Sequence, residues 1–251
     1  MSKLAELVRR TTRIEAAPLG FGVAQRKTPP TMLLVAVLSE RWTQASDALA
    51  AGADVLLLAG SPNENELAEV VAAAEGRPCG LRTPQIDAEG AAQLREAGID
   101  FLVVEPQTPA ATLQDEGLGF LLHLKEELTD AQLRTLDALP WDAILLERQA
   151  TPMTIEGQLE LQRIGGLARR ALLVSVPGDA NPIDLLPLRD AGASLIALDL
   201  KQRDALDALR RLREAIDGLP ARRVRRQEER AEVALPRATA SETVEEDEDA
   251  E

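Results

Sequence analysis

A phrase of one pattern occurs four times in the chain, and each copy has the form of a helix end followed by a buried strand. The copies are AGADVLLLAG at 51–60, AGIDFLVVEP at 97–106, LPWDAILLER at 139–148 and AGASLIALDL at 191–200. An Ala-Gly pair is typical of a helix C-terminus, where glycine adopts the left-handed conformation. A continuous apolar run is typical of a strand that is covered on both faces. The repeat therefore predicts parallel strands that alternate with helices.

Four further apolar runs of strand length complete the series, so that eight strands are expected. They are predicted at 31–38, 54–59, 78–82, 100–105, 118–123, 142–147, 171–176 and 194–199. A helical pattern follows each strand, although the fourth, PAATLQDEG, is short. Eight such units favour an α/β fold of the (β/α)8 type, a compact TIM barrel. An open doubly wound sheet is the alternative.

Helix starts are marked by a capping residue beside proline, because the capping side chain accepts a free amide and proline suits the first helical turn. Ser61 and Thr129 are also followed three residues later by Glu64 and Gln132, as in a capping box. The capped pairs are Ser61-Pro62, Thr83-Pro84, Thr108-Pro109, Thr151-Pro152 and Asn181-Pro182.

The chain divides into a barrel at 31–218 and two flanking segments. Residues 1–30 are predicted to form an amphipathic helix, with Leu4, Leu7 and Val8 on its apolar face, and then a loop, together covering the bottom of the barrel. Residues 219–251 are predicted to be a helical extension and a disordered charged tail, because the last thirteen residues hold seven acids and no base. Such a tail is either a solvated end or the contact to a protein partner.

Composition argues against several classes of partner. The net charge of −14 repels a phosphate backbone, and the chain has no Tyr, three Phe and two Trp for stacking bases, so no nucleic-acid partner is expected. No apolar run approaches the roughly 20 residues of a membrane span, so no membrane partner is expected. One cysteine excludes an internal disulfide, and the N-terminus lacks the pattern of a signal peptide. The predicted location is cytoplasmic.

The four phrases fall on the even-numbered strands, where they predict the layers of the barrel interior. Side chains alternate along a strand, so the first, third and fifth positions after an anchor residue share a face. The anchors are Asp54, Asp100, Asp142 and Ser194. The first and third positions after them are apolar. The fifth positions are Ala59, Glu105, Glu147 and Asp199, which places an acidic layer at the C-terminal mouth.

The segment DAGASLIALDL resembles the last strand of the phosphate-binding barrels, which include the ribulose-phosphate-binding and tryptophan-synthase α-like families. That family pattern runs roughly Gly-Ala-Asp-Gly-Val-Val-Val-Gly-Ser, and the resemblance implies a barrel over residues 31–217. The Gly-Ser end that holds phosphate in those families is Asp199-Leu200 here, and strand 7 is followed by the single Gly178. Because a carboxylate repels phosphate, neither a phosphate ligand nor FMN is favoured.

The odd-numbered strands add basic groups to the same mouth. Strand 5 ends at the only histidine, His123, with Lys125 on the same face, and strand 3 ends at Arg82. We expect Glu105, Glu147 and His123 to be catalytic, since clustered carboxylates and an imidazole suit acid–base work. Arg82, Lys125 and Asp199 are the predicted substrate-binding residues.

Two further roles are open for the acids. Glu105, Glu147 and Asp199 are the candidate ligands of Mg or Mn, which prefer oxygen. The structural alternative is a ring of ion pairs, with Glu105 on Arg82, Glu147 on His123 or Lys125, and Asp199 on Lys201.

Two hypotheses about function follow. The first is a lyase or isomerase that acts on a small anionic metabolite by proton transfer next to a carbonyl. The second is a barrel that has lost catalysis and serves as a binding or scaffold module. An enzyme should have an open mouth with unpaired acids, whereas a scaffold's mouth should be filled by paired charges.

Overall fold

Eight parallel strands close into a barrel in which each strand pairs with its neighbours in sequence and β8 pairs with β1. The computed structural model describes residues 1–12, 31–147, 152–201 and 204–220. The predicted TIM barrel is confirmed, and the open sheet is excluded. The strands are β1 (Leu33–Ser39), β2 (Val55–Ala59), β3 (Cys79–Arg82), β4 (Phe101–Val104), β5 (Gly119–His123), β6 (Ala143–Leu146), β7 (Ala171–Ser175) and β8 (Ala193–Asp199).

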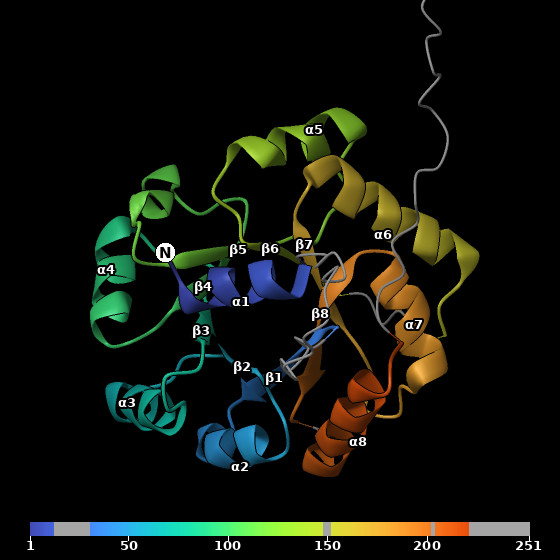
Figure 1. Cartoon of the computed structure of the whole chain (residues 1–251). Helices are drawn as coiled ribbons and strands as arrows, with labels where there is room; N and C mark the ends of the chain where they lie inside the picture. Colours follow the sequence, from blue (N-terminus) through green and yellow to red (C-terminus); the bar gives the residue numbers. More distant parts are fainter. Residues whose placement is uncertain (13–30, 148–151, 202–203, 221–251) are drawn as a thin grey trace, which may run out of the picture.

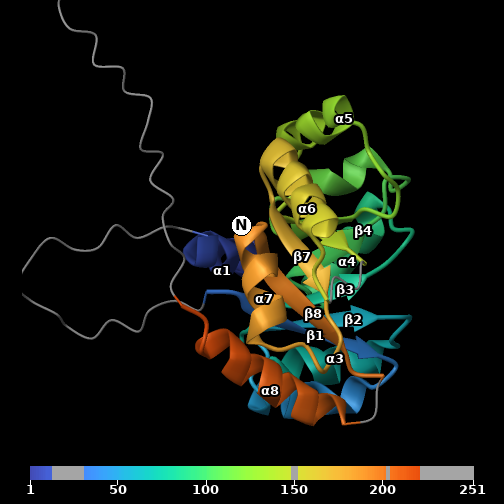
Figure 2. The same cartoon turned by 90° about the vertical axis from the view of Figure 1, so that its right-hand side faces the viewer.

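The outer helices ring the barrel, and α1 (Lys3–Thr12) lies across one of its ends (Figures 1 and 2). The fourth strand is followed only by a short 3-10 helix, Ala110–Gln114, as the weak pattern there suggested. None of the helices in the described ranges is long and apolar enough to cross a membrane. The outer helices are α2 (Ala45–Ala50), α3 (Glu64–Ala73), α4 (Ala88–Glu96), α5 (Asp130–Thr135), α6 (Ile155–Ala168), α7 (Pro182–Asp190) and α8 (Ala205–Asp217).

The predicted helix caps are confirmed at two positions and wrong at three others; one of the three is Thr108, because Pro109 holds the N-cap position of the 3-10 helix and no side chain caps it. Thr129 forms a capping box with Gln132, and Asn181 caps α7. The caps predicted at Ser61 and Thr83 are wrong, because the chain runs on for a few residues before each helix begins. Asn63 caps α3 with Glu66, Asp87 caps α4, and Thr154 caps α6. The cap predicted at Thr151 lies outside the described residues.

The barrel interior is filled by the apolar positions that the repeat predicts. Val55, Leu57, Phe101, Val103, Ala143, Leu145, Leu195 and Ala197 belong to one buried cluster inside the strands. The space on β3 is filled from its neighbour, since a Cβ on Gly80 would lie 2.3 Å from the ring of Phe101. Only glycine therefore fits beside this phenylalanine, and the predicted alternation of inward and outward side chains holds.

The N-terminal end of the barrel is closed by α1. Leu4 is fully buried in the interior cluster, and Val8 lies beside it. The carboxylate of Asp100 accepts the amides of Lys3 and Leu4 at 2.7 and 2.8 Å, which satisfies the free N–H groups of the first helical turn. The hydroxyl of Ser2 donates to Asp142 at 3.1 Å. Two of the three anchor aspartates, Asp100 and Asp142, thus hold the N-terminal segment that closes the barrel.

Candidate functional site

The predicted site residues lie at the C-terminal ends of the strands, where TIM barrels carry their active sites. Arg82, His123 and Asp199 are the last residues of β3, β5 and β8. Glu105 and Glu147 come directly after β4 and β6. The parallel register brings five of the six predicted residues into one connected set of contacts, with His123 at its centre.

Two ion pairs form across the mouth, and their partners differ from those expected. Arg82 on β3 pairs with Glu147 beyond β6. Lys125 pairs with Glu105 through an N–O distance of 2.5 Å. The expected pairs, Glu105 with Arg82 and Glu147 with Lys125, are exchanged, because Arg82 reaches across the mouth from β3 to the end of β6, while Lys125 pairs with the acid that follows the neighbouring strand β4.

His123 is enclosed by these two pairs. Its side chain is 1% exposed, its Nε2 lies 3.3 Å from Oε2 of Glu147, and its Nδ1 lies 3.8 Å from Oε1 of Glu105 and 3.5 Å from Nη2 of Arg82. The contact with Glu147 is the other partner expected for that acid. Nε2 is buried without a hydrogen bond of good geometry in the described structure. An imidazole that faces carboxylates on both sides, yet is not locked by either, is suited to gaining and losing a proton.

The local charges shift the pKa values of three groups. Burial, reinforced by the positive charge of Arg82, lowers the pKa of His123. The hydrogen bond from Lys125 lowers the pKa of Glu105. Burial raises the pKa of Glu147, but the hydrogen bond and charge of Arg82 outweigh it, so the net shift is downward. Near neutral pH the site therefore holds a neutral imidazole between two ionised carboxylates.

Asp199 lies apart from this set of contacts. Its carboxylate accepts the hydroxyl of Ser39 at 3.2 Å and the amide of Lys201 at 2.9 Å. The hydroxyl contact from β1 is not among the pairs expected from the sequence. Because Asp199 takes up the Lys201 amide itself, that amide is not directed at a ligand. The expected ion pair between Asp199 and the Lys201 side chain is not formed.

The carboxylates do not assemble into a metal cage. Among the described residues, no group of three or more His, Cys, Asp or Glu side chains is placed to hold a metal ion. The predicted Mg or Mn site at Glu105, Glu147 and Asp199 is therefore not formed in this structure. The physical reason is that Glu105 and Glu147 form ion pairs with basic side chains, whereas Asp199 accepts a hydrogen bond from Ser39.

A cavity of about 210 Å³ opens beside the site, between β5, β6 and α6. It is lined by His123, Lys125 and Glu147 from the predicted set, and by Arg163 of α6. Arg163 is fixed by Asp130 at 2.7 Å and by the carbonyl of Leu128 at 2.8 Å. No sequence signal pointed to Arg163, because it lies within a helix and reaches the mouth only through its long side chain.

The stability of the protein is expected to depend on pH through His123. Its pKa is lowered in the folded state, so as the pH falls below about 6.5 the unfolded chain binds a proton before the folded chain does. The free energy of unfolding therefore decreases on acidification from pH 7 to pH 5. Urea unfolding at both pH values measures the decrease.

The matched control is His123→Gln, which removes the only histidine of the chain. Carboxylates other than Glu105 and Glu147, which contact His123, titrate alike in both proteins and cancel in the comparison. The variant should lose less stability than the wild type between the two pH values. Equal losses in the two proteins would show that His123 does not have a lowered pKa.

Comparison with known proteins bears on the fold. No family model matches the chain, and no curated protein matches it. Among solved structures, thiamine phosphate pyrophosphorylase from Pyrococcus furiosus is 12% identical with a TM-score of 0.57, covering 75% of this chain and 96% of its own. The fold is a TIM barrel of the kind found in these enzymes.

Two further structures show the same likeness. The tryptophan synthase α-subunit from Pyrococcus furiosus is 14% identical with a TM-score of 0.60, covering 76% of this chain and 99% of its own. The 3-keto-L-gulonate-6-phosphate decarboxylase from Vibrio cholerae is 15% identical with a TM-score of 0.60, covering 74% and 97%. The resemblance to the ribulose-phosphate-binding and tryptophan-synthase α-like barrels is thus confirmed for the fold.

Proposed function

We propose that the protein is an enzyme that transfers a proton next to a carbonyl in a small anionic molecule, as an isomerase or a carbon–carbon or carbon–oxygen lyase. The observation that carries the proposal is His123, buried between Glu105 and Glu147 with an unlocked Nε2 at the catalytic end of a TIM barrel. The similar structures include a decarboxylase, which breaks a carbon–carbon bond. That chemistry fits the lyase alternative.

The ion pairs suggest how such a site would work. An anionic substrate would bind to Arg82 and Lys125 and displace the carboxylates that now pair with them. Displacement raises the pKa of the freed Glu105 or Glu147 toward its ordinary value, because the stabilising cation is lost. The freed carboxylate would then accept the proton from carbon. His123, neutral at that stage, would donate a hydrogen bond or a proton to the carbonyl oxygen.

Proton exchange at carbon tests the proposal without knowledge of the natural substrate. A panel of small keto acids and keto sugars would be incubated with the protein in D2O, and deuterium at the carbon next to the carbonyl would be followed by NMR. His123→Gln and Glu147→Gln should each slow the exchange by about 10²–10⁴-fold, the range of general acid–base catalysis. Glu69→Gln, an exposed acid on the outer helix α3 that lines neither cavity, serves as the control that leaves the rate unchanged.

A non-catalytic binding or scaffold module is the second candidate. The mutual pairing of Arg82 with Glu147 and of Lys125 with Glu105 favours it, because a filled ring of charges needs no substrate. If no member of the panel exchanges and Glu147→Gln mainly lowers stability, this second function replaces the first. A cytoplasmic location, the absence of a nucleic-acid partner, and a protein partner for the charged tail remain proposals from composition.

A further inference from the structure

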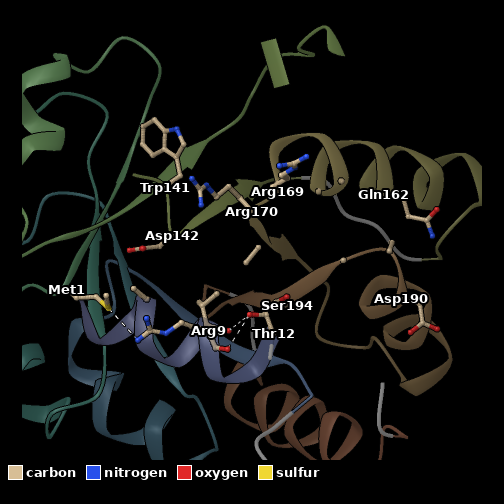
Figure 3. Close-up of a pocket in the computed structure, with 17 residues that line it drawn as sticks. Met1, Arg9, Thr12, Trp141, Asp142, Gln162, Arg169, Arg170, Asp190 and Ser194 are labelled. Atoms are coloured by element: carbon tan, nitrogen blue, oxygen red, sulfur yellow. Dashed lines mark hydrogen bonds between the residues drawn. The ribbon is translucent and has the colours of Figure 1, made fainter. Parts of the chain in front are cut away.

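A larger cavity lies at the opposite end of the barrel from the candidate active site. It has a volume of about 670 Å³, within the range of small-molecule sites. Figure 3 shows it between α1, the C-terminal part of α6 and the start of β8. Neither the proposed chemistry nor the closure of the barrel by α1 uses this space.

Arginines supply the positive charge of the cavity. Arg9 of α1 contacts only Sδ of Met1, at 3.5 Å, and has no carboxylate partner among the described residues. Arg169 at the end of α6 is 77% exposed, and its nearest acid is Asp137 at 3.7 Å. Arg170 is held by the carbonyls of Asp137 and Leu139 at 2.8 and 3.1 Å. Three guanidinium groups thus line one cavity: Arg169 and Arg170 share Asp137, at 3.7 and 3.5 Å, whereas Arg9 has no acidic partner within the part of the chain that the structure describes.

The acids of the cavity are engaged elsewhere. Asp142 accepts the hydroxyl of Ser2 at 3.1 Å. Asp190 accepts Nε and Nη2 of Arg189 at 3.0 and 2.8 Å. The C-terminal carbonyls of α6 and α7 also lie at this end and favour cations, so the arginines have to outweigh them. A ligand carboxylate that pairs with Arg9 therefore gains more binding free energy than one placed elsewhere in the cavity, because Arg9 has no acidic partner among the described residues.

The fourth copy of the repeat points to the same place. Its anchor, Ser194, stands where the other copies carry Asp54, Asp100 and Asp142, each of which makes a hydrogen bond at the barrel bottom. Ser194 is 6% exposed and lines the cavity, and its hydroxyl has no hydrogen-bond partner among the residues that the structure describes. The ring of anchors therefore lacks one carboxylate, and a free hydroxyl donor faces the gap.

Part of the cavity wall is the backbone of α6 at a glycine, where no side chain fills the adjacent space. A Cβ on Gly166 of α6 would meet nothing within 4 Å. Packing therefore does not require glycine there, although glycine costs a helix about 1 kcal/mol relative to alanine. The exposed backbone leaves room for a ligand to approach the helix.

We propose that this cavity binds a small organic molecule through its carboxylate, with Ser194 as hydrogen-bond donor and Arg9 and Arg169 as charge partners. The geometry requires an anion that enters from the N-terminal end of the barrel, away from the mouth. This carboxylate site is independent of the proposed activity, since the two cavities share no lining residue.

Calorimetric titration of the full chain with citrate and with succinate, at constant ionic strength set by NaCl, tests the proposal. At least one of the two should bind saturably. Arg9→Gln and Ser194→Ala should each weaken binding about tenfold or more. Gly166→Leu should abolish it by filling the open space, and leucine is the better helix former. Arg210→Gln, on the exposed side of α8, is the matched control and should bind as the wild type does.

A second source of carboxylates is the chain itself, because its last thirteen residues hold seven acids. A full-length variant in which these Glu and Asp residues become Gln and Asn distinguishes the sources. If the tail occupies the cavity, this variant binds citrate more tightly than the wild type does; if a free molecule is the ligand, the affinities agree. Absence of saturable binding in both proteins, or undiminished binding in both Arg9→Gln and Gly166→Leu, overturns the proposal.

Discussion

Phe101→Ala should lower the free energy of unfolding by about 3–5 kcal/mol, the usual cost of removing a buried phenylalanine side chain. Phe101 is 1% exposed and stands in the barrel interior, where its ring covers the bare backbone of Gly80 on the next strand. The truncation leaves a void that closed strands cannot collapse to fill. Urea unfolding at pH 7 measures the loss.

A double-mutant cycle shows whether the ring and the glycine are coupled. Gly80→Ala alone should be destabilising, because its Cβ would lie 2.3 Å from the ring. In the Phe101→Ala background the same change should be neutral or stabilising, since the methyl group enters the vacated space. The expected coupling energy is about 1–3 kcal/mol. Additive effects of the two changes would mean that the strands shift to separate them.

Leu4→Ala is expected to cost about 2–5 kcal/mol, although it changes a residue near the N-terminus. Leu4 is fully buried against the interior cluster, so its loss opens the bottom of the barrel. The matched control is Leu159→Ala on α6, which is 61% exposed and should change stability by no more than about 0.5 kcal/mol. Thermal and urea unfolding of both variants give the comparison.

Variants of Asp100 test whether hydrogen bonds, in addition to apolar contacts, hold α1 against the barrel. Asp100→Ala removes the acceptor of two amides of the first helical turn and should cost about 0.5–2 kcal/mol, as the loss of a helix cap does. Asp100→Asn keeps one oxygen acceptor and should cost less. If both variants are as stable as the wild type, then α1 is held by its apolar contacts alone.

The interior of the barrel is predictable from the sequence because the pattern that specifies it is local. Strand length, alternation and the glycine ahead of a strand are visible in a few consecutive residues, so the repeat alone assigns Val55, Phe101 and Leu195 to the interior. The same alternation indicates which side chains reach the mouth. It does not locate the helix starts closely, since Asn63 and Asp87 compete with nearby residues that cap equally well.

The sequence by itself determined the number and order of the strands, the layers inside them and the ends at which charged groups gather, because hydrophobic period and strand direction are properties of short segments. Only the tertiary structure decided which charges pair. Arg82 reaches Glu147 beyond β6 rather than Glu105 beyond the neighbouring β4, and Asp199 accepts a hydrogen bond from Ser39 of β1, because the sequence does not specify which way each side chain turns among several partners within its reach. The larger cavity was decided in the same way, where α1 meets the ends of distant helices.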